Sequence, residues 1–104
     1  MRNPNPGLAL YSASKAAVIS SMRSAAMECA PRGTRINAVA PGRVVTDMML
    51  AFGVADTSGV AAALPLRRMG RPEEVAEAVI WLASDEASYI VCHVLAADGG
   101  FLAS

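Results

Sequence analysis

The chain has 104 residues, enough for one domain and too few for two. Hydrophobic residues make up 54% of it and charged residues 17%, so its composition is too apolar for intrinsic disorder. Nine basic and nine acidic side chains cancel, and no basic cluster extends beyond Arg67 and Arg68, so we expect no nucleic-acid partner. No apolar stretch approaches the roughly 20 uncharged residues of a membrane span, and none is typical of a signal peptide. We therefore expect a cytoplasmic protein that makes no membrane contact.

The two cysteines, Cys29 and Cys92, lie far apart and match no Cys-x-x-Cys spacing. This pattern is typical of reduced thiols in a cytosolic protein and not of a disulfide framework or a metal site. We expect both to be packed side chains, and we expect no bound metal.

In chain order, residues 10–30 are mostly helix formers and stop at Pro31-Arg32-Gly33, which predicts a helix. Residues 34–40 contain β-branched side chains and end before Pro41-Gly42, which predicts a strand. Residues 43–70 mix polar turn residues with short apolar pieces. They predict a mobile segment with one or two short helices.

A second helix is predicted at residues 72–84. Pro72 suits the first helical position, and Glu73 and Glu74 lie where the positive end of the helix dipole favours carboxylates. Apolar side chains surround nearly the whole helix, as expected for a helix packed between other elements. Residues 93–98 predict a last buried strand, which ends in the tight turn of Asp98-Gly99-Gly100.

The two predicted strands should be parallel, because the connection between them is far longer than a hairpin and contains a crossover helix. Parallel strands are normally covered on both faces and flanked by neighbours. Two strands alone would leave both edges unpaired. The sequence therefore predicts the α/β class and one part of a larger sheet.

Tyr11 and Lys15 stand four residues apart on the first predicted helix, so their side chains share one face about 5 to 6 Å apart. A tyrosine hydroxyl is a poor acid or base at neutral pH unless a cation stabilises the phenolate. Lys15, the only lysine, provides that cation. The pair could exchange a proton with the oxygen of a carbonyl or an alcohol. The alternative is an aromatic anchor beside a solvated lysine.

Several motifs occur together in register. They are Tyr11-Ser12-Ala13-Ser14-Lys15, Asn37-Ala38-Val39-Ala40-Pro41-Gly42, Gly70-Arg71-Pro72-Glu73-Glu74 and Asp98-Gly99-Gly100. From Gly7 to Phe101 the chain thereby resembles the short-chain dehydrogenase/reductase (SDR) family, in its classical branch. The resemblance implies the C-terminal part of a Rossmann-like, doubly wound parallel sheet. It also implies an oxidoreductase that transfers a hydride between NAD or NADP and a small-molecule carbonyl or secondary alcohol.

The resemblance assigns roles to particular residues. Tyr11 matches the catalytic tyrosine that passes a proton to or from the substrate oxygen. Lys15 matches the lysine that assists this tyrosine and binds the nicotinamide ribose. The loop that holds the nicotinamide and pyrophosphate end of the cofactor matches Pro41, Gly42, Val44 and Thr46. Such a loop lies at the carboxyl end of a parallel strand, where ligands of these sheets bind.

The chain also departs from the family pattern. It has no glycine-rich turn to cradle the cofactor pyrophosphate, and the family's catalytic serine would fall before Met1. We therefore expect the dinucleotide-binding half to be absent and the chain to be inactive alone. Cys92 stands where relatives usually have glycine, and a Cβ there would cost about 1 kcal/mol or more if the backbone has a positive φ.

An alternative function is a non-catalytic module that dimerises or binds another protein. Members of the family pair through the helix that carries the tyrosine and through the later helix with the last strand. The resemblance therefore implies a homo-oligomer formed through residues 10–30 and through residues 72–84 with the last strand. The segment from Asp47 to about Leu66 matches the family's substrate lid, and the alternative is a plain surface connection.

Overall fold

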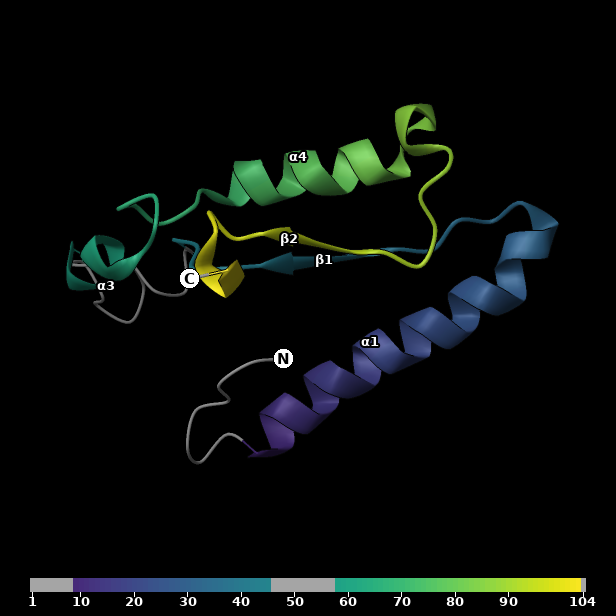
Figure 1. The fold of residues 1–104 in the computed structure, drawn as a ribbon, viewed down its shortest axis with the longest axis horizontal. Coiled ribbons are helices and arrows are strands. Elements are labelled where there is room, and N and C mark those ends of the chain that lie inside the picture. The colour runs from purple at the N-terminus through teal and green to yellow at the C-terminus, as the bar shows by residue number, and fades with distance from the viewer. Residues whose placement is uncertain (1–8, 46–57, 104) are drawn as a thin grey trace.

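The computed structural model of the protein describes residues 9–45 and 58–103. A long helix is followed by a strand, two further helices and a last strand (Figure 1). The bounds of these elements are α1 Ala9–Cys29, β1 Ala38–Pro41, α3 Ser58–Ala63, α4 Pro72–Ala83 and β2 Val94–Ala97. Single turns of 3-10 helix follow α1, α4 and β2, at Ala30–Arg32, Asp85–Ala87 and Phe101–Ala103.

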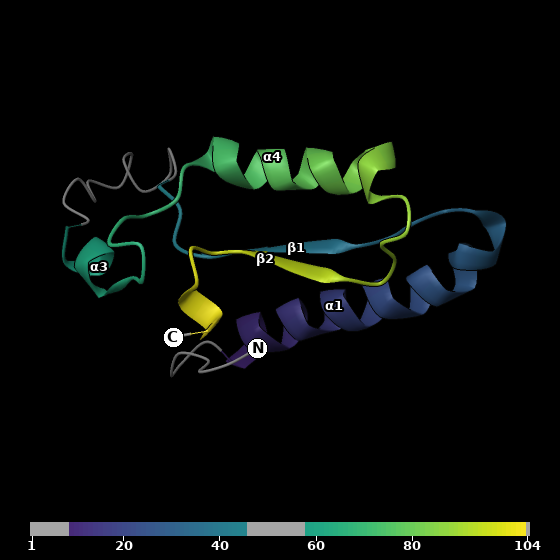
Figure 2. The same cartoon turned by 45° about the horizontal axis from the view of Figure 1, so that its top comes forward.

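The two strands pair in parallel, as the sequence predicts. Ala38 lies opposite Val94, and Pro41 lies opposite Ala97. Helix α4 contacts both strands, and two views of the ribbon place α1 on the other side of the strand pair (Figures 1 and 2). A parallel pair with a helix on each side is the arrangement of an α/β sheet. The predicted α/β class is therefore confirmed.

The hydrophobic core of the described residues is small. Its members are Met22 and Ala26 from α1, Leu82 from α4, and Leu64 and Ala87 from the connections. Within the described part, none of the helices is long and apolar enough to cross a membrane. The two cysteines are free thiols, both half-buried.

The strand boundaries correct the predicted ones. The sequence predicts strands at 34–40 and 93–98, but β1 begins only at Ala38 and β2 has four residues. Just before β1, the Asn37 side chain adds to the backbone bond that the Cys92 N–H donates to the Ile36 carbonyl at 2.9 Å. The Asn37 Oδ1 accepts the backbone N–H of His93 at 2.9 Å, and its Nδ2 donates to the Ile90 carbonyl at 3.0 Å. A side-chain amide can thus satisfy backbone groups that would otherwise pair with another strand.

Helix α4 begins at the predicted residue and is held at both ends by side chains. At its start, Glu74 accepts the backbone N–H of Arg71 at 3.0 Å and pairs with the Arg68 guanidinium through two hydrogen bonds of 2.8 and 2.9 Å. At its end, Arg35 donates to the carbonyls of Leu82 and Ser84 at 2.9 and 3.0 Å. The Leu82 carbonyl lies in the last turn of the helix, where carbonyl groups lack helical partners, and the Ser84 carbonyl also accepts the Ala87 N–H at 3.2 Å.

The Arg68 contact changes the acidity of Glu74. The hydrogen bond from Arg68, and then the backbone N–H of Arg71, lower the pKa of Glu74 from 4.5 to about 2. The same hydrogen bond from Glu74 raises the pKa of Arg68. A carboxylate in the first turn also interacts favourably with the helix dipole.

Within the described part of the chain, α4 is covered less completely than its sequence predicts. Leu82 is its one buried residue, while Val79, Ile80 and Trp81 are 48%, 68% and 41% exposed. The sequence predicts a helix surrounded by other elements, and the described residues cover only one side of it. Large apolar side chains exposed together on one helix usually mark a contact surface.

Cys92 adopts a φ of +62°, in the left-handed region that side chains with a Cβ avoid. The positive φ that we considered for this usual glycine position is therefore present. The turn after β2 also forms as predicted, because Asp98 Oδ1 accepts the Gly100 N–H at 2.9 Å and Oδ2 accepts the Leu102 N–H at 3.0 Å.

Replacing Cys92 with glycine should stabilise the fold. We expect Cys92→Gly to raise the free energy of unfolding by roughly 0.5 to 1 kcal/mol. This gain is the backbone strain that is relieved, minus the additional conformational entropy that a glycine loses on folding. Urea unfolding followed by circular dichroism measures this change. Cys92→Ala keeps the Cβ and should give no gain, so equal stability of the two variants would contradict the strain.

Acid should weaken the fold through Glu74. Its pKa in the folded state, about 2, lies below the usual 4.5, so its stabilising contribution is complete above pH 4.5 and is lost as the pH falls from 4.5 to about 2. The difference in urea midpoint between wild type and Glu74→Gln should shrink across this window at low salt. Glu73→Gln is the control because no ion pair of Glu73 occurs among the described residues. A difference that stays constant over the window would contradict the assignment.

Candidate active site

The tyrosine and lysine singled out in the sequence lie together near the start of α1. The Lys15 Nζ is 5.5 Å from the centre of the Tyr11 ring, within the range of a cation–π contact. Both side chains are exposed, Tyr11 by 57%. Ser14 Oγ donates a hydrogen bond to the Tyr11 carbonyl at 2.8 Å, one turn back along the helix. A phenol and an ammonium group are therefore available side by side on one helix.

This pair lies at the end of the molecule where the strands finish. Both ribbon views place the first turns of α1 at the same end as the carboxyl ends of β1 and β2 (Figures 1 and 2). The helix runs away from this end, and β1 returns to it. Ligands of parallel α/β sheets bind beyond the carboxyl ends of the strands. The topology therefore brings the tyrosine pair to the end of the sheet where a ligand is expected.

The loop after β1 makes a close backbone contact. Pro41 is the last residue of β1, and the Gly42 N–H donates to the Ala97 carbonyl at 3.3 Å. A Cβ at Gly42 would lie 2.7 Å from the Cβ and 2.8 Å from the Cα of Asp98. No side chain fits at such distances, so the ends of the two strands can approach this closely only with glycine at position 42.

Val44 takes part in a second backbone contact, which is smaller than the pairing of β1 with β2. It forms an isolated parallel bridge with Gly70, in which Val45 N–H donates to the Gly70 carbonyl at 3.1 Å and Gly70 N–H donates to the Arg43 carbonyl at 2.8 Å. This bridge therefore joins the start and the end of the segment that connects β1 with α4. Thr46 and much of the predicted lid lie outside the described residues, and α3 is the short helix that the structure describes in residues 58–70.

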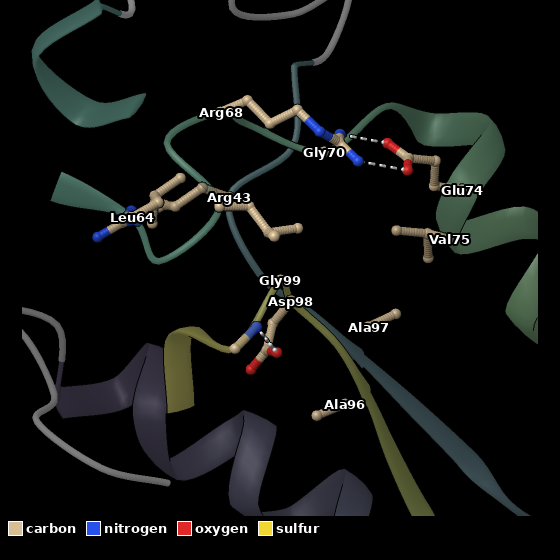
Figure 3. A pocket seen from close by; sticks show the side chains of 12 residues that line it. Arg43, Leu64, Arg68, Gly70, Glu74, Val75, Ala96, Ala97, Asp98 and Gly99 are labelled. Atoms are coloured by element: carbon tan, nitrogen blue, oxygen red, sulfur yellow. Dashed lines mark hydrogen bonds and ion pairs between the residues drawn. The ribbon is translucent and has the colours of Figure 1, made fainter. Parts of the chain in front are cut away.

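A pocket of about 280 Å³ lies beside this loop, between the start of α4 and the end of β2 (Figure 3). The Arg68–Glu74 ion pair forms one wall, Val75 and Ala97 line a second side, and Asp98 lies opposite the ion pair. The carboxylates of Glu74 and Asp98 already accept hydrogen bonds from the protein. The pocket therefore offers a small, largely apolar space with few free polar groups.

Sequence reasoning missed the side chains that fix this region. Arg43 places its guanidinium 5.6 Å from the centre of the Phe101 ring and so links the loop after β1 to the C-terminal turn. Asn37 ties the start of β1 to the segment before β2. An asparagine inside an apolar strand was a usable signal for the second contact, whereas no sequence signal pointed to the first.

A methyl group at position 42 should disrupt the strand ends. We expect Gly42→Ala to lower the free energy of unfolding by about 1 to 3 kcal/mol, the usual cost of forcing extra volume into a filled site. Gly59→Ala is the matched control, because a Cβ there meets nothing within 4 Å and residue 59 lies in a helix, where alanine is favoured. Thermal unfolding of both variants distinguishes them, and equal midpoints would contradict the close approach.

Comparison with known proteins identifies the chain's relatives. A family model described as "Enoyl-(Acyl carrier protein) reductase" matches residues 2–102. A cis-4-hydroxycyclohexanecarboxylate dehydrogenase of Sinomonas cyclohexanicum is 48% identical over 93 residues, 89% of this chain and 37% of its own length. A 3-oxoacyl-[acyl-carrier-protein] reductase of Thermotoga maritima is 44% identical over 98 residues, 94% of this chain and 40% of its own. The chain thus spans about two fifths of the length of these relatives.

Solved structures of related proteins share the fold of this chain. A short chain dehydrogenase/reductase family protein, 42% identical, superposes with a TM-score of 0.84 and covers 98% of this chain and 41% of its own. The protein ElxO with NADP bound is 33% identical, with a TM-score of 0.86 over 98% of this chain and 42% of its own. With a family model over nearly the whole sequence and the same fold in solved relatives, the chain belongs to the short-chain dehydrogenase/reductase family, of whose Rossmann-like fold it forms a C-terminal part.

Proposed function

We propose that this chain supplies the tyrosine and lysine of an active site that interconverts a small-molecule carbonyl and a secondary alcohol with NAD or NADP. The observation that carries this proposal is the exposed Tyr11–Lys15 pair, 5.5 Å from ammonium to ring centre, at the carboxyl ends of two parallel strands. Two relatives support the reaction class, since one is named as a reductase of 3-oxoacyl groups and the other as a dehydrogenase of a hydroxy acid.

The residues present fit one end of the cofactor. We assign the nicotinamide end to the loop after β1, which lies at the carboxyl end of the strand pair and where Val44 is fixed by its bridge to Gly70. Pro41 and Thr46 complete this assignment. The chain contains no glycine-rich turn for the pyrophosphate, so the described site holds the cofactor only in part.

In the proposed reaction the nicotinamide supplies or accepts the hydride, and the protein's residues handle the proton. The Tyr11 hydroxyl donates its proton to the substrate oxygen during reduction and takes one back during oxidation. The positive charge of Lys15 stabilises the phenolate that remains. A carbonyl carbon that gains a hydride needs a proton on its oxygen, so one positioned acid completes the step.

A second candidate function is a non-catalytic module that acts by association. The exposed apolar side chains of α4 favour it, namely Val79, Ile80 and Trp81. By family resemblance, a homo-oligomer would form through α1 and through α4 with β2. The retained Tyr11–Lys15 pair would then have no task, which makes catalysis the better-supported function.

A chimera tests the catalytic proposal. We expect the Thermotoga maritima reductase, with its matched segment replaced by this chain, to reduce a ketone with NADPH or NADH, whereas the 104-residue chain alone gives no turnover. Tyr11→Phe in the chimera should lower kcat by about 10²- to 10⁴-fold, the usual contribution of a positioned acid. Tyr89→Phe is the matched control, because Tyr89 is the only other tyrosine and is 99% exposed. A folded chimera whose rate does not depend on Tyr11 would contradict the proposal.

A further inference from the structure

Arg67, in the segment between α3 and α4, has a strained backbone. Its φ is +58°, and Cys92 is the only other non-glycine residue of the described ranges with a positive φ. A side chain with a Cβ raises the free energy of this left-handed conformation. Such residues persist where surrounding contacts compensate for the strain, and they cluster at sites that hold ligands. The contacts of Arg67 therefore indicate what the strained conformation serves.

The side chain of Arg67 reaches back to the end of α3. Its Nη1 donates to the Ala62 carbonyl at 2.7 Å and to the Leu64 carbonyl at 3.4 Å. The backbone N–H of Arg67 donates to the same Leu64 carbonyl at 2.9 Å. Ala62 lies in the last turn of α3, where carbonyl groups lack helical partners, and an arginine beyond the end of a helix can bind them. Arg67 therefore caps α3.

Helix α3 depends on contacts of this kind. It has six residues, Ser58–Ala63, and so short a helix is not stable by itself in water. Val60 is its largest side chain and is exposed, so α3 buries little apolar surface of its own. A hydrogen bond from a charged donor to its last turn is therefore a large part of what fixes its orientation.

The residues that follow α3 lie against the turn after β2. A Cβ at Gly99 would lie 3.2 Å from Leu66 Cδ1, and a Cβ at Gly100 would lie 3.5 Å from Pro65 Cβ. Leu64 is buried. Leu64 and Leu66 both line the pocket of about 280 Å³ beside the loop after β1. The segment between α3 and Arg67 thus forms an apolar wall of that pocket.

We propose that Arg67 is a positioning residue of the candidate active site. By capping α3, it fixes the wall that Leu64 and Leu66 provide, and this wall sets the affinity for the carbonyl substrate. The pocket lies at the end of β2, on the side of the sheet where ligands of parallel α/β folds bind. An apolar wall favours a substrate with an apolar group near its carbonyl. This inference rests on the function proposed above.

The neighbouring arginine holds the other end of the same segment. The guanidinium of Arg68 pairs with Glu74 in the first turn of α4, whereas that of Arg67 binds the last turn of α3. Two adjacent arginines thus connect one short segment to two different helices. Of these two side chains, Arg67 is the one that contacts α3, so its substitution should loosen α3 and leave α4 in place.

Hydrogen exchange in the chimera described above tests the capping. Asparagine tolerates a positive φ better than arginine does, but its side chain is too short to reach the Ala62 carbonyl. Lysine keeps a long cationic donor. We expect Arg67→Asn to speed amide exchange in residues 58–64 by about 3- to 10-fold, the effect of losing one exposed hydrogen bond, and Arg67→Lys to stay close to wild type.

Mass spectrometry of peptides from α3 and α4 gives the decisive comparison. Exchange in α4 should not change in either variant. Exchange in α3 that is equal or slower in Arg67→Asn would mean that relief of strain outweighs the cap, and would overturn the proposal. An equal rise in α3 and α4 would mean general destabilisation and would overturn it as well.

Steady-state kinetics of the chimera test the effect on the substrate. We expect Arg67→Asn to raise KM for the ketone by about 3- to 10-fold while kcat changes by less than about 2-fold, and Arg67→Lys to restore most of the affinity. Arg32→Asn is the matched control, because Arg32 is an exposed arginine in the turn after α1. An unchanged KM in Arg67→Asn, or an equal rise in Arg32→Asn, would overturn the proposal.

The positioning role and the catalytic proposal fail separately. Hydrogen exchange is measured without substrate or cofactor, whereas the catalytic proposal is tested by the dependence of the rate on Tyr11. A chimera whose rate ignores Tyr11, but whose α3 is loosened by Arg67→Asn, would contradict the catalysis and support the capping. A Tyr11-dependent chimera in which Arg67→Asn changes neither the exchange of α3 nor the KM would do the reverse.

Discussion

The parallel pairing of β1 with β2 is the constraint on which the rest of the molecule depends. It joins residues more than fifty positions apart, and at one end a side chain secures it together with the backbone bond from the Cys92 N–H to the Ile36 carbonyl. There the amide of Asn37 bonds to both Ile90 and His93. At the other end Gly42 lies directly against Asp98. Because α4 lies in the connection between the strands and contacts both, this pairing also positions α4 over the sheet, and with it the wall of the pocket beside the loop.

Much of the fold could be predicted from local sequence. The stop at Pro31-Arg32-Gly33 and the start at Pro72 are encoded by residues whose backbone preferences act within a few positions, so the helix ends were predicted within one residue. The start of β1 was not, because the segment before Ala38 depends on the Asn37 side chain, which bonds to residues far away in sequence. Likewise, the sequence of α4 predicts cover on all sides, but it cannot say whether the covering elements belong to the same polypeptide.

The candidate site likewise combines contacts that local sequence predicts with contacts that depend on tertiary structure. Tyr11 and Lys15 are four residues apart in one helix, and helix geometry places such residues side by side. Their proximity could therefore be predicted from their spacing in the sequence. The contact of Arg43 with Phe101 could not, because it links two loops through tertiary structure alone. Resemblance supplied the roles proposed for the loop residues, whereas the structure supplied the physical reason why position 42 is glycine, the lack of space beside Asp98.

The approach of Gly42 to Asp98 has a genetic consequence. A Cβ at position 42 would meet not only the Cβ of Asp98 at 2.7 Å but also its Cα at 2.8 Å and its carbonyl oxygen at 3.2 Å. The obstacle is therefore the main chain itself, which every amino acid shares. A second mutation that shortens the side chain at position 98, even to glycine, would leave that obstacle in place. Selection for revertants of a position 42 mutant should accordingly recover glycine at position 42 and no compensating change at position 98.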